Sequence, residues 1–165
     1  MPASQDDLFS RLAVLGVVTE TVSHPPLRTV ADSQALRGQI PGAHTKNLFL
    51  KDRKDQFFLV TLDENAVVDL KTIHTIIGAA GKVSFGNADM LSHLLGVEPG
   101  AVTPFGLIND VDCRVKMVFD ADLWAHEIIN AHPLANDRTT SISRAGLEAF
   151  VRSTGREPLV LKVSA

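Results

Sequence analysis

Three short stretches of the sequence carry groups that could do chemistry. In the first, Lys46 and Asn47 stand directly before the apolar run 48–50, so a buried strand would fix an ammonium group and a carboxamide in place. Such a pair can bind a phosphate, a carbonyl or a ribose. A lysine at the start of a strand is more commonly a solvated residue, because lysine side chains are mostly exposed. The interpretation therefore depends on the other two stretches.

The second stretch is the loop 100–106, and the third is the turn 132–136. Gly100 permits a close approach of the backbone, and Pro104 stiffens the far end of its loop. Such a loop can direct amide N–H groups at a carbonyl or hold a water molecule, although the pattern is also typical of an ordinary turn. His132 follows a predicted strand in a proline-containing turn, a position at which functional side chains are commonly presented.

Apolar periodicity and capping residues predict the elements that must position these groups. Interspersed helices, strands and tight hairpins favour an α/β (α+β) fold, in which a mixed β-sheet is flanked by helices, over a doubly wound parallel sheet. With no repeat and no long linker, residues 1–165 are expected to form a single domain. The expected helices are 6–15, 30–36, 69–77, 87–95 and 143–154, with one helical turn over 120–124, and the expected strands are 18–23, 48–50, 57–62, 82–85, 115–119, 127–131, 139–142 and 159–163.

Composition narrows the classes of protein. The chain has 165 residues, 45% of them apolar, but no run approaches the roughly 18 apolar residues that a membrane span needs. The N-terminus lacks the pattern of a signal peptide, and a lone cysteine, Cys113, suits a reducing cytoplasm. A net charge of −3 argues against a protein that coats DNA or RNA by charge, although contact with one end of a nucleic acid stays open.

The sequence gives little support for a metal site or for a catalytic nucleophile. The six histidines show no His-x-x-x-His spacing, and the single cysteine gives no Cys-x-x-Cys pair, so no metal or other cofactor is expected. Cys113 lies at a predicted strand edge, where a lone cysteine usually packs as a small hydrophobe. There is also no serine nucleophile elbow and no glycine-rich phosphate loop.

The sequence resembles the YbaK/prolyl-tRNA-synthetase-associated domain family of free-standing trans-editing deacylases. The resemblance is carried by three motifs in this order: Lys46-Asn47, Gly100-x-x-x-Pro104, and His132-Pro133 with Asn136. The similarity spans residues 8–163 and is greatest to the alanine-specific members. It implies hydrolysis of the ester that joins a wrong amino acid to the 3′ end of tRNA. Such a second step is needed because one missing methylene group gives a synthetase only about 1–3 kcal/mol of discrimination against alanine.

The resemblance also implies roles for individual residues and for partners. The expected partner is the acceptor end of mischarged tRNA(Pro), and prolyl-tRNA synthetase is a further candidate. Binding to a membrane or to DNA is not expected. The implied residues are Lys46, Asn47 and Gly100 for catalysis, Thr29, Leu48, Pro104, Phe105, His132 and Asn136 for substrate binding, and Lys51, Arg53, Lys54, Arg138 and Arg144 for contact with tRNA phosphates.

Three alternatives stay open at this point. The same chemistry could act on cysteine or serine esterified to a tRNA, because these small side chains differ by one atom. The chain could instead be a non-catalytic module that binds aminoacyl-tRNA or a synthetase. A third alternative is a small-molecule hydrolase that uses Cys113 as its nucleophile.

Overall fold

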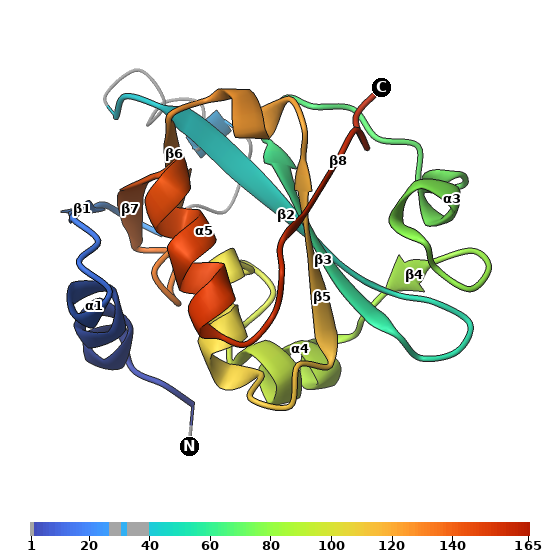
Figure 1. Ribbon diagram of the computed structural model, residues 1–165, viewed down its shortest axis with the longest axis horizontal. Helices are drawn as coiled ribbons and strands as arrows, with labels where there is room; N and C mark the ends of the chain where they lie inside the picture. The colour runs from blue at the N-terminus through green and yellow to red at the C-terminus, as the bar shows by residue number, and fades with distance from the viewer. Residues whose placement is uncertain (1, 27–30, 33–39) are drawn as a thin grey trace.

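A mixed β-sheet organises the protein, seen in a computed structural model that describes residues 2–26, 31–32 and 40–165 (Figure 1). Within these residues the sheet has eight strands in the order β1-β7-β6-β2-β3-β5-β8, with β4 beside β2. The predicted fold class is thereby confirmed. The strands are β1 (Thr19–Ser23), β2 (Ala43–Lys51), β3 (Phe57–Asp63), β4 (Ser84–Phe85), β5 (Val115–Asp120), β6 (Ile128–Ala131), β7 (Arg138–Ser143) and β8 (Leu159–Leu161).

Strand β2 connects the two parts of this sheet. On one side it pairs with β3 in the predicted antiparallel hairpin, and β3, β5 and β8 then continue as parallel neighbours. On the other side it pairs with β6 in parallel through only two residue pairs, Ala43 with Ile129 and His44 with Asn130. Beyond His44, the two strands part.

Helices cover the sheet, and the longer ones begin at side-chain caps. The helices are α1 (Gln5–Val14), α3 (Ile73–Ile77), α4 (Ala88–Leu95) and α5 (Arg144–Ser153), with 3₁₀ helices η1 (Pro104–Asn109) and η2 (Leu123–Ala125). Ser4, Asn87 and Ser143 each accept a backbone N–H at the start of α1, α4 and α5, as N-cap residues do. In Figure 1, α5 lies in front of the sheet, whereas α3 and β4 lie together at the right.

Two apolar clusters pack against opposite faces of β2 and β3, because alternate strand residues point to opposite sides. Phe49 and Leu59 belong to the larger cluster, which includes buried residues of α1, α4 and α5. Leu50 and Phe58 belong to the smaller cluster, which includes Ile73 of α3. We call these sides the α5 face and the α3 face.

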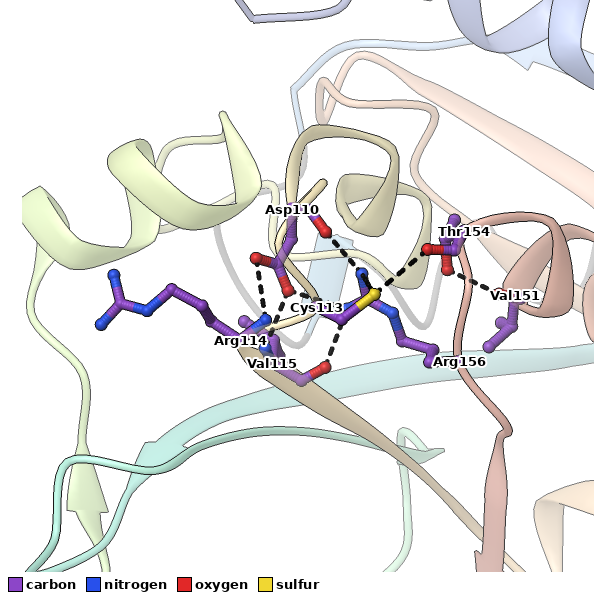
Figure 2. Close-up of polar contacts among 7 residues, drawn as sticks. All are labelled: Asp110, Cys113, Arg114, Val115, Val151, Thr154 and Arg156. Carbon is purple, nitrogen blue, oxygen red and sulfur yellow. Dashed lines mark hydrogen bonds and ion pairs between the residues drawn. The ribbon is translucent and has the colours of Figure 1, made fainter.

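A buried ion pair fastens the segment after η1 to the C-terminal segment (Figure 2). Arg156 donates from Nη1 to Asp110 Oδ2 at 2.8 Å and from Nη2 to the Asp110 carbonyl at 2.6 Å, with side-chain exposures of 8% and 2%. The Asp110 carboxylate also accepts the backbone N–H groups of Arg114 and Val115. Neither buried charge is left without a partner, which burial of charges requires.

The boundaries of several elements differ from the predictions for local reasons. The helix predicted over 69–77 begins only at Ile73, since the Asp69 side chain accepts the Lys71 N–H and forms a turn instead. The loop predicted over 100–106 gives way to η1 at Pro104, where proline suits a first helical position. The helix predicted over 30–36 falls almost entirely outside the described residues. No helix within the described ranges is long and apolar enough to cross a membrane.

Candidate functional site

Lys46 and Asn47 lie on β2 just past the point where β2 and β6 part. The Lys46 side chain is half-buried and donates to the Ala66 carbonyl, and Ala66 packs against the cluster on the α3 face. The Asn47 Oδ1 atom accepts a hydrogen bond from Thr61 Oγ1 at 2.5 Å. Because neighbouring strand residues point to opposite sides, Lys46 serves the α3 face and Asn47 the α5 face. The structure therefore separates two groups that the sequence analysis treated as a pair.

A small polar cavity lies at the point where β2 and β6 separate. Its volume is about 20 Å³, which is room for a single water molecule. His44 and Thr45, the two residues before Lys46 on β2, line this cavity. His132, the residue that follows β6, lines it as well. The complete lining is His44, Thr45, Glu64, Asn130, Ala131, His132 and Thr139. The arrangement can hold one water molecule or one small polar group of a ligand.

His132 lines this cavity and keeps one ring nitrogen as a hydrogen-bond acceptor. Its Nδ1 lies 2.9 Å from the Arg138 carbonyl, and because a carbonyl can only accept, Nδ1 carries the hydrogen and Nε2 the lone pair. Burial lowers the pKa of His132 below the ordinary 6.5, and the nearby His24 and His44 lower it further, against the raising effects of the Arg138 carbonyl and Asp137. His132 is therefore neutral at physiological pH.

This protonation state predicts a pH effect on stability. The unfolded chain binds a proton to His132 near pH 6.5, whereas the folded chain does so only at lower pH. The contribution of neutral His132 to the free energy of unfolding is therefore fully present above the unfolded pKa and is lost as pH falls through the folded pKa. Urea unfolding at about pH 7.5 and about pH 5.5 should show a larger loss for the wild type than for His132→Asn. An equal loss in both would show that His132 is not held neutral by its surroundings.

Further polar groups around the cavity were missed by the sequence analysis. His24 Nε2 lies 2.8 Å from Thr139 Oγ1, and the His24 ring lies 6.3 Å from that of His132. Asn130 is buried and donates from Nδ2 to the carbonyls of Pro41 and Ala43, which fastens β6 to β2 at their joint. The one available signal was an asparagine inside an otherwise apolar strand, since a buried amide needs partners.

Gly100 lies against the turn that contains Asn136. A Cβ atom added at Gly100 would come within 3.2 Å of Asn136 Nδ2, a tight contact that glycine avoids. The two segments border a cavity of about 320 Å³ that is lined by Gly96, Val97, Glu98, Gly100, Ala101, Leu134, Ala135 and Asn136. The structure thus brings the second and third predicted stretches together, and the turn 132–136 reaches both cavities.

Three predicted pocket residues have other positions. Phe105 is fully buried in the core, with its ring 5.3 Å from that of Phe150, so it lines neither cavity. Pro104 is also buried, as the first residue of η1. Leu48 packs against the cluster on the α3 face. Thr29 lies outside the described residues.

The predicted basic residues occupy three separate places. Lys51, Arg53 and Lys54 gather at the turn between β2 and β3, where Lys51 pairs with Asp55 at 3.6 Å. Arg138 donates to Gln5 Oε1 on α1, and Arg144 donates to the Trp124 carbonyl. Only the first group forms a continuous basic segment. Within the described ranges, no group of three or more His, Cys, Asp or Glu residues could hold a metal ion.

Comparison with known proteins places this arrangement in a family. Residues 24–150 match the family described as aminoacyl-tRNA editing domain. The chain is 34% identical over 149 residues to the prolyl-tRNA editing protein ProX of Acetoanaerobium sticklandii, with 90% of each chain covered. It is 35% identical over 158 residues to the prolyl-tRNA synthetase associated domain-containing protein 1 of Bos taurus, covering 93% of this chain and 92% of the relative.

The fold agrees with this relationship. A solved structure described as a candidate trans-editing enzyme for prolyl-tRNA synthetase superposes with a TM-score of 0.70 at 18% identity, covering 98% of this chain and 99% of that one. That likeness concerns the fold, whereas the family rests on the sequence matches above. On these matches, the chain belongs to the aminoacyl-tRNA editing domain family.

Proposed function

We propose that this protein is an aminoacyl-tRNA deacylase that removes alanine from mischarged tRNA(Pro). The proposal is carried by the placement of Lys46 and His132 in a chain of this family. His44 and Asn130 form the last pair between β2 and β6, and Lys46 and His132 each lie two residues beyond it. An ammonium group and a neutral imidazole therefore flank the place where two parallel strands part. A crevice at which neighbouring strands of an open α/β sheet diverge is a common ligand site.

The reaction needs no strong nucleophile, because an aminoacyl ester is already reactive. Water attacks the ester carbonyl carbon, the bond to the ribose oxygen breaks, and that oxygen takes a proton, which releases alanine and tRNA. Lys46 supplies positive charge for the terminal phosphate or for the oxygen on which negative charge develops. His132 Nε2 accepts a hydrogen bond from the substrate ammonium group, the 2′-hydroxyl or the attacking water.

The other predicted residues take supporting positions. Asn47 lies on the α5 face with its carboxamide oxygen engaged by Thr61, so its NH₂ group can donate to the substrate carbonyl or ribose only where the substrate passes between β2 and β6 to that face. Gly100 allows the backbone of its loop to approach a ligand in the cavity that it shares with Asn136. Selectivity arises from exclusion, because a site fitted to alanine rejects the ring of proline and leaves correctly charged tRNA intact.

The partners and compartment follow from the proposed reaction. We expect the acceptor end of tRNA(Pro) to bind at the site, and prolyl-tRNA synthetase to be a further partner. The name of the bovine relative supports the second expectation. The expected compartment is the cytoplasm, where a free Cys113 thiol is stable.

A substrate panel tests the proposal. The protein is incubated with alanyl-, cysteinyl-, seryl- and prolyl-tRNA(Pro), and loss of each ester is followed over time. Fast loss of alanine, with the proline ester intact, is the expected result. Preference for cysteine or serine would keep the reaction and change the substrate. Binding of all four without hydrolysis would contradict the proposal and favour a binding module, and loss of activity in Cys113→Ala would point to a thiol hydrolase.

A further inference from the structure

Phe85 is exposed in a protein that buries its other aromatic side chains. The sequence has eight phenylalanines, one tryptophan and no tyrosine, all within the described residues. Phe85 is 58% exposed, whereas the remaining eight rings are buried or half-buried. It lies on the two-residue strand β4, opposite Leu50 of β2. A single exposed apolar side chain is not by itself a sign of a binding surface, so the residues around Phe85 decide its role.

Basic side chains surround Phe85. Lys51 of β2 is paired with Ser84, the residue before Phe85. Arg53 lies against Gly81, and its backbone N–H donates to the Ala80 carbonyl, which brings the turn 52–55 beside the segment that leads into β4. Lys54 and Lys82 are exposed. We call Lys51, Arg53, Lys54, Lys82 and Phe85 the hairpin surface.

The two acidic residues close to the hairpin surface, Asp52 and Asp55, do not cancel its positive charge. Asp52 is buried, and its carboxylate accepts the backbone N–H groups of Lys54, Gln56 and Ala80. Asp55 is paired with Lys51. Segments 51–55 and 81–86 carry a net charge of +2 in a chain whose total is −3. Positive charge beside an exposed aromatic ring is the combination with which proteins bind single-stranded nucleic acid.

The hairpin surface lies within reach of the site at Lys46. Leu50 and Lys46 are four residues apart on one strand and point to the same side, which corresponds to about 13 Å along β2. Phe85 is the partner of Leu50, about 5 Å to the side, and so points to this same α3 face. Leu50 itself is buried in the cluster of the α3 face, so a single strand whose terminal nucleotide lies at Lys46 would reach Phe85 along the edge of β2 between β6 and β4.

We propose that the hairpin surface binds the unpaired 3′ end of tRNA, with Phe85 stacked on a base that precedes the terminal adenosine and with the lysines and Arg53 on the backbone phosphates. This assignment rests on the proposed deacylase function, since it takes the terminal adenosine to lie at Lys46. It adds a specific base-stacking residue to the predicted phosphate contacts. Stacking tolerates any base, so the surface would measure the length of the unpaired end rather than its sequence.

Binding of uncharged RNA tests the stacking contact without requiring turnover. The probes are an acceptor-stem minihelix of tRNA(Pro) with its unpaired 3′ end and the same minihelix cut to a blunt end. Phe85→Ala and Phe85→Leu should each weaken binding of the first probe about fivefold or more and leave the blunt probe unchanged, while Phe85→Trp retains affinity. Equal affinity of Phe85→Ala and wild type for the first probe would overturn the proposal.

The phosphate contacts have a separate readout in salt dependence. Lys82→Gln should reduce the slope of log affinity against log salt by about 0.7–0.9, the value of one phosphate contact. Lys162→Gln is the charge-matched control, because Lys162 follows β8 at the opposite edge of the sheet from β4. An unchanged slope in Lys82→Gln would remove Lys82 from the surface.

A turnover experiment separates this inference from the proposed function. Phe85→Ala should raise KM for alanyl-tRNA(Pro) and leave hydrolysis of the small ester alanyl-adenosine unchanged, because that ester does not reach β4. If the wild type hydrolyses neither ester, the proposed function is wrong. The RNA-binding measurements still test whether the hairpin surface binds the unpaired 3′ end. If Phe85→Ala loses association with prolyl-tRNA synthetase but binds RNA normally, the surface belongs to a protein partner and the proposal is wrong.

Discussion

Replacing Lys46 with alanine is expected to lower kcat/KM for alanyl-tRNA(Pro) by about 10²- to 10³-fold, the usual cost of removing one group that stabilises charge in the transition state. Lys46 lies two residues beyond the last pair between β2 and β6, and the two residues before it, His44 and Thr45, line a cavity of single-water size. The next cation on β2 is Lys51, which is five residues further along the strand and paired with Asp55. The measurement is single-turnover deacylation, which separates the chemical step from product release.

Two controls make the result for Lys46 specific. Lys46 also donates to the Ala66 carbonyl, so thermal unfolding of Lys46→Ala must show that the fold survives loss of that hydrogen bond. Lys51→Ala removes the same charge from the same strand and should change KM far more than the chemical step. Near-normal single-turnover hydrolysis by Lys46→Ala would refute the assigned role.

Replacing Asp110 with alanine is expected to destabilise the protein by about 3–5 kcal/mol, because removal of one partner leaves the Arg156 charge buried and uncompensated. Both side chains are more than nine-tenths buried, and Arg156 Nη1 also donates to the Val115 carbonyl (Figure 2). Out of a typical total of about 5–15 kcal/mol, this is a large fraction. Urea unfolding followed by circular dichroism measures the loss.

An exposed pair on the same part of the chain serves as the comparison. Arg152 contacts Glu148 and Glu157 with about half of its side chain exposed, so Arg152→Ala should cost at most about 1 kcal/mol. Arg156→Lys keeps the charge but cannot supply the forked donors, and should fall between wild type and Asp110→Ala. A loss below about 1 kcal/mol for Asp110→Ala would show that water reaches this pair.

Local patterns predicted most of the fold. The hairpin of β2 and β3 followed from two apolar runs around a polar turn, and the caps at Asn87 and Ser143 followed from side chains that accept backbone N–H groups. The order of the strands could not be predicted in this way. It depends on contacts between distant segments, such as the pairing of β3 with β5 and of β1 with β7, for which a single sequence carries no local signal.

The candidate site was predictable in part. Lys46, Gly100, His132 and Asn136 were proposed from their residue types and order. The structure places His132 in the lining of the small cavity and Gly100 and Asn136 in that of the larger one, whereas Lys46 lines neither. Phe105 was misplaced because an aromatic residue after a loop proline can point either way, and only the packing against Phe150 decides it. The roles of these residues in hydrolysis stay predictions until the variants are measured.

The joint between β2 and β6 controls how wide the candidate site can be. Within the described residues, β2 and β6 pair through two residues each, with further hydrogen bonds from the Asn130 and Thr45 side chains. Lys46 and His132 stand on opposite sides of that joint. The angle between the two half-sheets therefore sets the width of the gap that a substrate enters. Gly42 occupies this hinge at a φ of 105°, and any side chain there would collide with Ile128. On the proposed function, the selectivity of the site would thus depend on a residue that touches no substrate.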